Sequence, residues 1–191
     1  MECTETAARK KEIRKRVLAL RDGMTGEERR RASFLVTDRL LGHQWFYRAQ
    51  NLLCFVSFGS EIDTSELIEE ALRAGRKVFV PKVEGQDMHF YRIGSLEELK
   101  EGYKGIGEPD GSTEEYIYRE EDEEKTIMIM PGVAFDPYRR RLGYGKGFYD
   151  RFLAARKGLL LHTIAIGFAC QQVEELPEDE KDVRPYQVIL G

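Results

Sequence analysis

The sequence is poor in cysteine, has no long apolar run and carries no excess of positive charge. Its three cysteines, Cys3, Cys54 and Cys170, are odd in number and far apart. This pattern excludes a disulfide framework and a zinc spacing, and it fits a reducing compartment. No segment approaches the ~20 apolar residues of a membrane span, and the opening stretch MECTETAARKKEIRKR lacks the apolar part of a signal peptide. We therefore expect a cytoplasmic protein with no membrane partner.

The charge balance disfavours a general nucleic-acid binder. The chain carries 30 Lys and Arg against 34 Asp and Glu, giving a net charge of −4, whereas such binders usually have a basic excess. Its 191 residues, of which 41% are hydrophobic, are enough for one domain with a substantial core. We expect a single domain over residues 1–191, acting as a monomer on small molecules.

Apolar periodicity predicts an α/β fold. The expected strands are 51–58, 77–83, 88–93, 126–130, 162–168 and 187–190. The expected helices are 5–22, 25–41, 64–75, a short one from Ser95, and 147–156. Thr25 with Glu28 has the spacing of a capping box, and Thr64 is a candidate cap for the third helix. Strands separated by helices favour a three-layer sandwich around a mainly parallel, mixed sheet. The acidic segment 108–124 is expected to be a solvated loop.

The stretch PYRRRLGYGKGFYDRF, residues 137–152, is the most unusual part of the chain. It has neither the spacing of a P-loop nor the last glycine of a Rossmann fingerprint. It does place three alternating glycines before a predicted helix. Amides at a helix N-terminus attract anions, and Arg141 and Lys146 add positive charge. This arrangement favours a phosphate site, although an ordinary glycine-bearing surface loop has the same composition.

Four further charged residues are candidates because of where they lie. Asp150 is in the first turns of the predicted helix, at what we expect to be an exposed loop–helix junction, where it would hold Mg²⁺ or favour the helix dipole. Glu61 follows a strand end, where ligands bind in open α/β sheets. Lys10 and Arg14 share one helix face. Each of these residues also fits an ordinary role, as a loop carboxylate or as part of a solvated basic face.

Six segments together resemble the 5-formyltetrahydrofolate cyclo-ligase family, also called the 5,10-methenyltetrahydrofolate synthetases. The most specific is PGVAFDPYRRRLGYGKGFYDRF, residues 131–152. The others occur in the family's order: the Lys10/Arg14 pair, SFGSEIDT (57–64), VPKV (80–83), GIGEP (105–109) and IGFACQQVEELPEDEKD (166–182). The resemblance covers nearly the whole chain.

The resemblance implies an enzyme that uses ATP as co-substrate and Mg²⁺ as cofactor. In the family, the formyl oxygen of 5-formyltetrahydrofolate is phosphorylated, and N10 attacks the activated carbon. Ring closure gives 5,10-methenyltetrahydrofolate, ADP and phosphate. Phosphorylation makes physical sense because it converts a poor leaving group into a good one, and the protein must align the two substrates and neutralise charge.

The resemblance also assigns roles to residues of this sequence. Arg141, Lys146 and Asp150 would be catalytic, and Asp150 and Asp182 would hold the metal. ATP would be bound by Lys10, Arg14, Arg141, Leu142, Gly143, Tyr144, Gly145, Lys146, Gly147, Phe148 and Tyr149. The folate would be bound by Val56, Glu61, Tyr144 and Phe148, with Glu61 accepting hydrogen bonds from pterin N–H groups. Taken from the residues alone, Asp182 lies in an acidic run that is ordinarily solvated.

Some positions depart from the family pattern. Tyr144 stands where some members have arginine, and Phe148 stands where tyrosine is commoner. Lys104 falls where some members carry an aromatic residue, but Tyr103 is adjacent to it. Two other functions also fit the sequence. The basic stretches 9–21 and 139–146 suit a nucleotide or RNA-binding module without turnover, although a pure RNA surface gains nothing from nearby carboxylates. Another ATP-dependent enzyme acting on a different carbonyl compound is also compatible.

Overall fold

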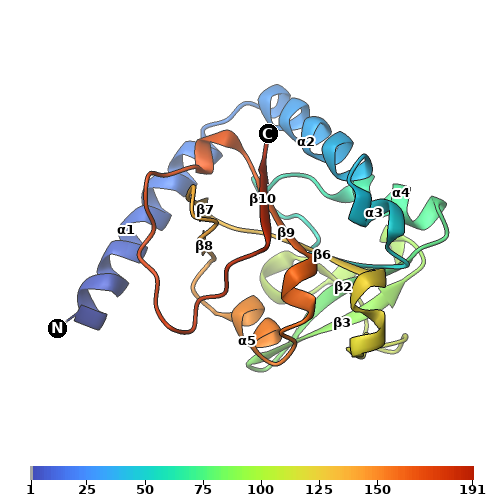
Figure 1. The fold of residues 1–191 in the computed structure, drawn as a ribbon. Coiled ribbons are helices and arrows are strands. Elements are labelled where there is room, and N and C mark those ends of the chain that lie inside the picture. The colour runs from blue at the N-terminus through green and yellow to red at the C-terminus, as the bar shows by residue number, and fades with distance from the viewer. Residues whose placement is uncertain (1) are drawn as a thin grey trace.

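A six-stranded sheet forms the centre of the protein, seen in a computed structural model that describes residues 2–191 (Figure 1). The strands are β1 (Asn51–Cys54), β2 (Lys77–Glu84), β3 (Asp87–Ile93), β6 (Thr126–Met130), β9 (Thr163–Gly167) and β10 (Gln187–Leu190). Their order is β10-β9-β6-β1-β2-β3. All neighbours are parallel except β2 and β3, which form an antiparallel hairpin. The predicted mixed, mainly parallel sheet is therefore confirmed.

Helices cover both faces of this sheet. The α-helices of the described residues are α1 (Glu2–Asp22), α2 (Gly26–Leu41), α3 (Gln44–Arg48), α4 (Ser65–Arg73) and α5 (Phe148–Ala154), of which α2 to α5 cover the sheet. Figure 1 shows α2, α3 and α4 on one side of the sheet and α5 on the other. Side chains alternate accordingly: Leu52 belongs to the core cluster that includes α2–α4, whereas Leu53 belongs to the cluster that includes α5. Because β6 and β9 are covered on both faces, every residue in them is buried.

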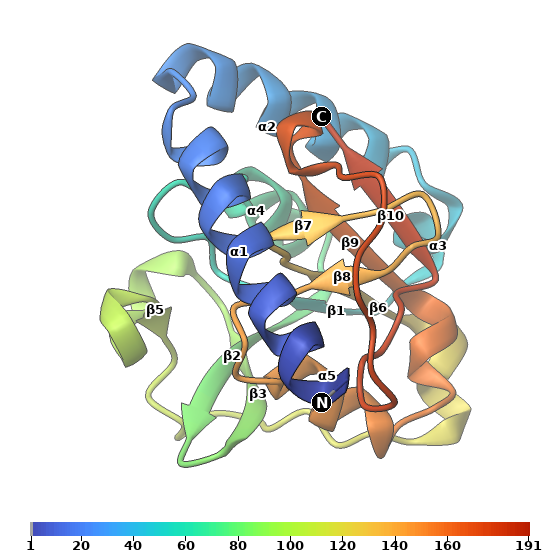
Figure 2. The ribbon, with the colours of Figure 1, turned by 90° about the vertical axis from the view of Figure 1, so that its left-hand side faces the viewer.

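Helix α1 packs apart from the main sheet. Its Ile13 and Val17 form a third buried cluster with residues that surround a small antiparallel pair, β7 (Ala134–Phe135) and β8 (Arg141–Leu142). In Figure 2, α1 crosses in front of this pair. The chain between β6 and α5 is thereby held against α1.

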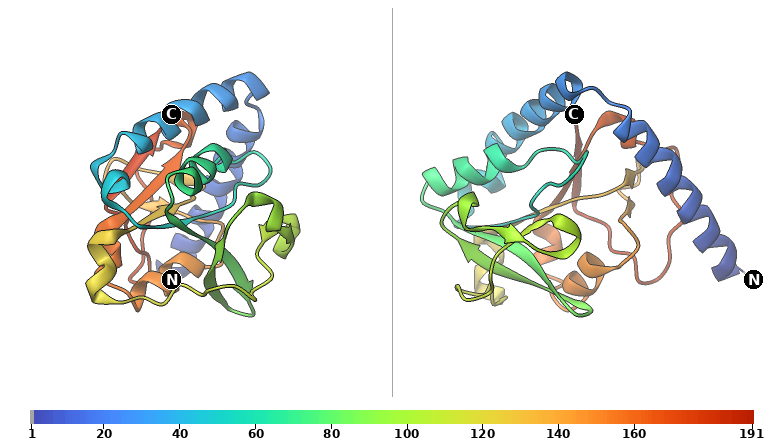
Figure 3. Two further views of the ribbon diagram at one scale, coloured as in Figure 1. Left: turned by 90° about the vertical axis from the view of Figure 1, so that its right-hand side faces the viewer. Right: turned by 180° about the vertical axis from the view of Figure 1, so that it is seen from behind.

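A second small pair, β4 (Lys100–Glu101) and β5 (Gly107–Glu108), lies beside the β2–β3 hairpin, as Figure 3 shows. Neither small pair was predicted from the sequence, since two-residue strands leave no periodic pattern. The short helix expected from Ser95 is a single 3-10 turn, Leu96–Glu98. Across the described residues, no helix has both the length and the apolar composition that crossing a membrane requires.

Local signals predicted one helix cap correctly and one wrongly. Thr25 accepts a hydrogen bond from the Glu28 amide at 3.2 Å, and Glu28 accepts one from the Thr25 amide at 2.7 Å, which is the predicted capping box of α2. Thr64 stands at the N-cap position of α4, but its side chain makes no capping hydrogen bond. Its hydroxyl instead donates to the Phe55 carbonyl at 2.9 Å and accepts from the Ser57 amide at 3.2 Å. These bonds fold back the loop after β1, so that β1 ends at Cys54 and not at residue 58.

The acidic segment 108–124 is more ordered than the solvated loop expected from its charge. Tyr116 is buried and packs edge-on against Phe79 at 5.4 Å between ring centroids. Its amide donates to the Phe90 carbonyl at 2.8 Å, so the segment runs along the edge strand β3. A 3-10 helix, Glu120–Lys125, then leads into β6. Burial of Tyr116 and pairing with β3 therefore order this segment despite its many exposed carboxylates.

Candidate functional site

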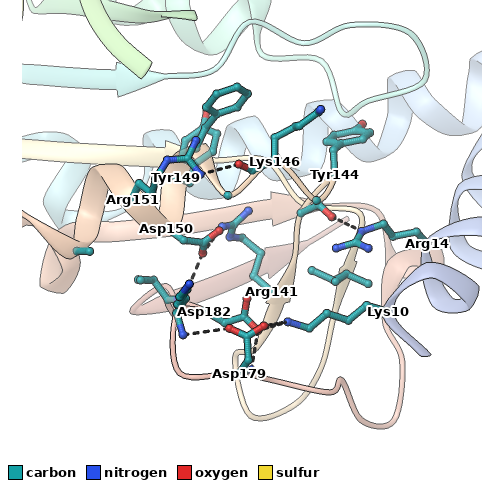
Figure 4. A pocket seen from close by; sticks show the side chains of 18 of the residues that line it. Lys10, Arg14, Arg141, Tyr144, Lys146, Tyr149, Asp150, Arg151, Asp179 and Asp182 are labelled. Carbon is teal, nitrogen blue, oxygen red and sulfur yellow. Dashed lines mark hydrogen bonds and ion pairs between the residues drawn. The ribbon is translucent and has the colours of Figure 1, made fainter. Parts of the chain in front are cut away.

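A glycine loop connects β8 to α5 and lines a cavity of about 780 Å³. Gly145 and Gly147 have φ of +93° and +64°, a region that side chains disfavour. The opposite walls come from α1 and from the loop over residues 179–183 (Figure 4). The structure therefore brings together the three parts of the chain that were predicted to bind nucleotide and metal: Lys10 and Arg14, residues 141–150, and Asp182.

Arg14 fastens α1 to the glycine loop. Its Nε donates to the Gly143 carbonyl at 2.8 Å. A Cβ at position 145 would lie 3.3 Å from the Arg14 guanidinium carbon. The positive φ of Gly145 therefore favours glycine, and a side chain there would also crowd the Arg14 guanidinium.

Lys10 is buried at the wall of this cavity and is not part of a solvated basic face. Its Nζ donates to Asp179 Oδ2 at 2.8 Å and also to Asp182 Oδ2. The Asp179 amide donates to the same Asp182 oxygen at 2.9 Å. Burial by itself lowers the pKa of Lys10, but the bonds to Asp179 and Asp182 and their charges outweigh it, so the pKa is raised. Lys10 is thus a charged ammonium held by two carboxylates.

Arg141 and Asp150 form a second ion pair in the same cavity. Arg141 Nη2 donates to Asp150 Oδ1 at 3.0 Å, and the Arg141 side chain is only 3% exposed. Its guanidinium also donates to the Pro131 carbonyl at 3.3 Å and lies 5.5 Å from the centroid of Tyr149. The Val183 amide donates to Asp150 Oδ1 at 3.2 Å. The expectation that Asp150 lies at an exposed junction is wrong, because its side chain is 20% exposed and joins two elements.

The two predicted metal ligands, Asp150 and Asp182, both line this cavity. Within residues 2–191, no three or more His, Cys, Asp or Glu side chains are grouped in a way that could hold a metal ion. This donor set does not suit an ion that needs a cage made only of protein. It fits Mg²⁺, which commonly takes one or two carboxylates and completes its shell with phosphate oxygens and water.

A smaller, mainly apolar cavity of about 130 Å³ lies beside the large one. Val56, Tyr103 and Phe148 are among its walls, and the Tyr103 and Phe148 rings meet edge-on at 6.2 Å. The side chain of Lys104 lies outside the described residues, but its neighbour Tyr103 lines the cavity. Five residues line both cavities: Pro131, Tyr144, Lys146, Phe148 and Tyr149.

Glu61 and Glu108 are the carboxylates that line the small cavity. Glu61 Oε1 accepts a hydrogen bond from the Tyr144 hydroxyl at 2.7 Å, and Glu61 Oε2 accepts one from the Phe58 amide at 3.2 Å. Burial raises the pKa of Glu61, and the bonds to Tyr144 and Phe58 and the charge of Arg21 oppose this only in part. A fixed acceptor in an apolar cavity is suited to the N–H edge of a flat heteroaromatic ring.

Three residues of the site were missed from the sequence. Arg151 donates to the Lys146 carbonyl at 2.8 Å and to the Gln86 carbonyl, and its guanidinium lies 5.3 Å from the centroid of Phe148. Arg21 is buried, and its guanidinium carbon lies 5.8 Å from the centroid of the Tyr144 ring. Asp179 is the second partner of Lys10. The only signal for Arg151 was its place one turn into the helix after the glycine loop, and Asp179 could not be told apart from its acidic neighbours.

Comparison with known proteins gives one consistent result. The family model described as the 5-formyltetrahydrofolate cyclo-ligase family matches residues 6–191. The 5-formyltetrahydrofolate cyclo-ligase of Haemophilus influenzae is 29% identical over 186 residues, covering 96% of this chain and 98% of that protein. The Escherichia coli protein of the same name is 30% identical over 171 residues, covering 85% and 90%.

Structural similarity agrees with this result. The solution structure of Aquifex aeolicus 5,10-methenyltetrahydrofolate synthetase superposes with a TM-score of 0.78 at 35% sequence identity. That alignment covers 92% of this chain and 86% of the other. Since the family match extends over almost the whole chain and the fold agrees with it, the chain belongs to the 5-formyltetrahydrofolate cyclo-ligase family.

Proposed function

We propose that this protein catalyses the ATP- and Mg²⁺-dependent conversion of 5-formyltetrahydrofolate to 5,10-methenyltetrahydrofolate, with release of ADP and phosphate. The observation that carries the proposal is the common wall of the two cavities, which includes Tyr144, Lys146 and Phe148. A phosphoryl donor in the large cavity and an acceptor in the small one would meet at this wall. Family membership supports the same pair of substrates.

The small cavity suits the pterin ring. Val56, Tyr103 and Phe148 provide apolar contacts, and Glu61 accepts hydrogen bonds from the pterin N–H groups. Those groups belong to the pyrimidine ring of the pterin, whereas N5 belongs to the fused pyrazine ring. With its N–H edge at Glu61, the pterin would place its N5-formyl group away from that carboxylate, and the proposed reaction requires this group to lie near Lys146, which lines both cavities.

The large cavity suits the triphosphate of ATP. The amides of residues 142–149 surround the anion, with Lys10, Arg14 and Arg141 nearby. Lys146 is exposed, and among the described side chains none forms a hydrogen bond or ion pair with its ammonium group. Lys146 is thus the cation available to follow the γ-phosphoryl group. Asp150 and Asp182 would hold Mg²⁺, which would supply further positive charge to the phosphate oxygens.

The reaction then proceeds in two steps. The formyl oxygen attacks the γ-phosphorus, and the bond to the β,γ-bridging oxygen breaks to release ADP. The N10 lone pair attacks the activated formyl carbon, N10 gives up its proton, and the carbon–oxygen bond breaks to release phosphate. Lys146 neutralises charge at the transferring group, and Arg141 orients Asp150.

Near-UV absorbance tests this proposal directly. Purified protein is mixed with 5-formyltetrahydrofolate, ATP and Mg²⁺, with parallel samples that lack ATP or Mg²⁺. We expect the methenyl product band to grow only in the complete mixture, with one phosphate released per product. A flat trace from folded protein contradicts the proposal.

A further inference from the structure

The ammonium group of Lys10 forms an ion pair with Asp182, a proposed metal ligand. Lys10 Nζ donates to Asp182 Oδ2 and, at 2.8 Å, to Asp179 Oδ2 (Figure 4). We propose that Lys10 is a tethered counter-ion, which holds Asp182 in the nucleotide-free enzyme and yields it to a divalent cation only when a nucleotide enters. The inference rests on the proposed function at one point, the assignment of Asp182 as a metal ligand.

The charges in the large cavity support this exchange. Its walls carry six positive side chains, Lys10, Arg14, Arg141, Lys146, Arg151 and Lys181, and four negative ones, Asp150, Asp179, Glu180 and Asp182. A divalent cation that entered alone would add to this positive excess, and it would compete with Lys10 for Asp182 and with Arg141 for Asp150, where repulsion between partly buried charges is strong. A triphosphate that enters with the cation brings negative charge that offsets both the walls and the ion. The cavity therefore favours the metal–nucleotide complex over the free metal ion.

Of the two ion pairs, the one between Lys10 and Asp182 can open to admit a metal ion, whereas Arg141 is held in place beside Asp150. The Arg141 guanidinium is bonded to the Pro131 carbonyl as well as to Asp150, and its side chain is 3% exposed. Lys10 has a flexible stem, and its partners lie toward solvent: the side chain of Asp179 is 53% exposed and that of Asp182 is 26% exposed. The ammonium can thus leave Asp182 and reach an incoming phosphate oxygen without a change in the fold.

The consequence can be measured without turnover. Mn²⁺ is used as the probe, and the electron paramagnetic resonance signal of free Mn²⁺ reports how much is bound. Without nucleotide, we expect Lys10→Met to bind Mn²⁺ at least about tenfold more tightly than the unmodified protein, which corresponds to about 1.4 kcal/mol. The control Lys15→Met, an exposed lysine on the same helix, should match the unmodified protein. Equal Mn²⁺ affinity in the unmodified protein and Lys10→Met overturns the inference.

A double variant locates the ion. In Lys10→Met/Asp182→Asn the gain in Mn²⁺ affinity should disappear, and a gain that persists overturns the inference because the ion would then lie elsewhere. Where Lys10→Met does not fold, the unmodified protein supplies the test. The ¹⁵N signal of the Lys10 side chain, assigned with Lys10→Arg, should stay unchanged on adding Mg²⁺ alone and should shift when a non-hydrolysable ATP analogue is added with it. A shift caused by Mg²⁺ alone, or no shift with both, overturns the inference.

The outcomes for the inference and for the proposed function can be told apart. Product formation in the absorbance assay together with equal Mn²⁺ affinities removes the role of Lys10 and leaves the cyclo-ligase reaction intact. Tighter Mn²⁺ binding by Lys10→Met, together with no product band from the unmodified protein, supports the counter-ion role and removes the proposed reaction.

Discussion

The hydroxyl of Tyr144 donates a hydrogen bond to Glu61 over 2.7 Å, which joins two loops that lie 83 positions apart in the sequence. Burial raises the pKa of Tyr144, and the negative charge of Glu61 raises it further, so the hydroxyl remains a protonated donor. Because Tyr144 belongs to the glycine loop and Glu61 lies in the small cavity, this bond connects the two proposed substrate sites.

Tyr144→Phe removes this bond and keeps the ring. We expect the KM for 5-formyltetrahydrofolate to rise about tenfold, the equivalent of about 1.4 kcal/mol, because Glu61 loses the donor that orients it. The kcat should change much less. Steady-state kinetics with each substrate varied would measure this, with the exposed Tyr138→Phe as the matched control. An unchanged folate KM would show that Tyr144 acts only through its ring.

Glu61→Gln should make the protein more stable at neutral pH while weakening folate binding. Since burial raises the pKa of Glu61, the folded state binds this proton more tightly than the unfolded chain. The contribution of Glu61 to the free energy of unfolding therefore falls as pH rises from its ordinary pKa through its folded pKa. Once ionised, the buried side chain is destabilising, and the amide removes that charge. We expect Tm at pH 7 to rise by about 2–4 °C for each 1 kcal/mol gained.

Thermal unfolding at two pH values checks the cause. At pH 4, below the ordinary pKa of glutamate, Glu61 is mostly protonated in both states, so the difference in Tm between Glu61→Gln and the unmodified protein should shrink. A difference of the same size at both pH values would mean that ionisation of Glu61 is not its source.

A structural feature could be predicted when the interaction that produces it joins residues close together in the sequence. The capping box of Thr25 and Glu28 spans three residues, so the sequence alone revealed it. The bond from Thr64 to the Phe55 carbonyl spans nine positions and crosses a loop, so the predicted cap of α4 was wrong. Tyr116 lies in a segment whose charge predicts exposure to solvent, but it is buried by residues far away in the sequence, among them Phe79 on β2 and Phe90 on β3.

In the candidate site, too, short-range features could be predicted and long-range contacts could not. Local composition predicted an anion-binding loop around Lys146, and the resemblance supplied Glu61 and Asp182. No local pattern predicts the bond between Lys10 and Asp182, which are 172 positions apart and meet because α1 packs against the β7–β8 pair. The same is true of Arg151, whose partner Gln86 comes from the turn between β2 and β3.

Arg151→Ala should weaken ATP binding through the glycine loop. Arg151 fixes the Lys146 carbonyl and lies over Phe148, so its loss should raise the KM for ATP about tenfold with a smaller effect on the folate KM. Arg151→Lys should not restore it, because a single ammonium group cannot reproduce the two-sided contact of a guanidinium. Kinetics with ATP varied would measure this, with the exposed Arg48→Ala as control. Recovery by lysine would mean that charge alone matters.

Asp150→Ala and Asp150→Asn should separate the structural role of this residue from its proposed metal role. Alanine leaves the buried Arg141 guanidinium without its carboxylate and the Val183 amide without its acceptor. We expect the free energy of unfolding to fall by about 2–4 kcal/mol, somewhat less than the 3–5 kcal/mol typical of breaking a fully buried pair, because Asp150 is partly exposed. Asparagine keeps an acceptor oxygen, so its loss should be smaller.

Both substitutions should abolish Mg²⁺-dependent turnover, since an amide oxygen is a weaker ligand for Mg²⁺ than a carboxylate. Urea unfolding would measure stability, and the absorbance assay across a Mg²⁺ titration would measure turnover. Asp38→Ala, on the exposed face of α2, is the control and should change neither quantity. A stable Asp150→Asn protein with unreduced turnover would remove Asp150 from the metal site and leave it as the partner of Arg141. A stable but inactive Asp150→Asn would assign the carboxylate charge itself to the reaction.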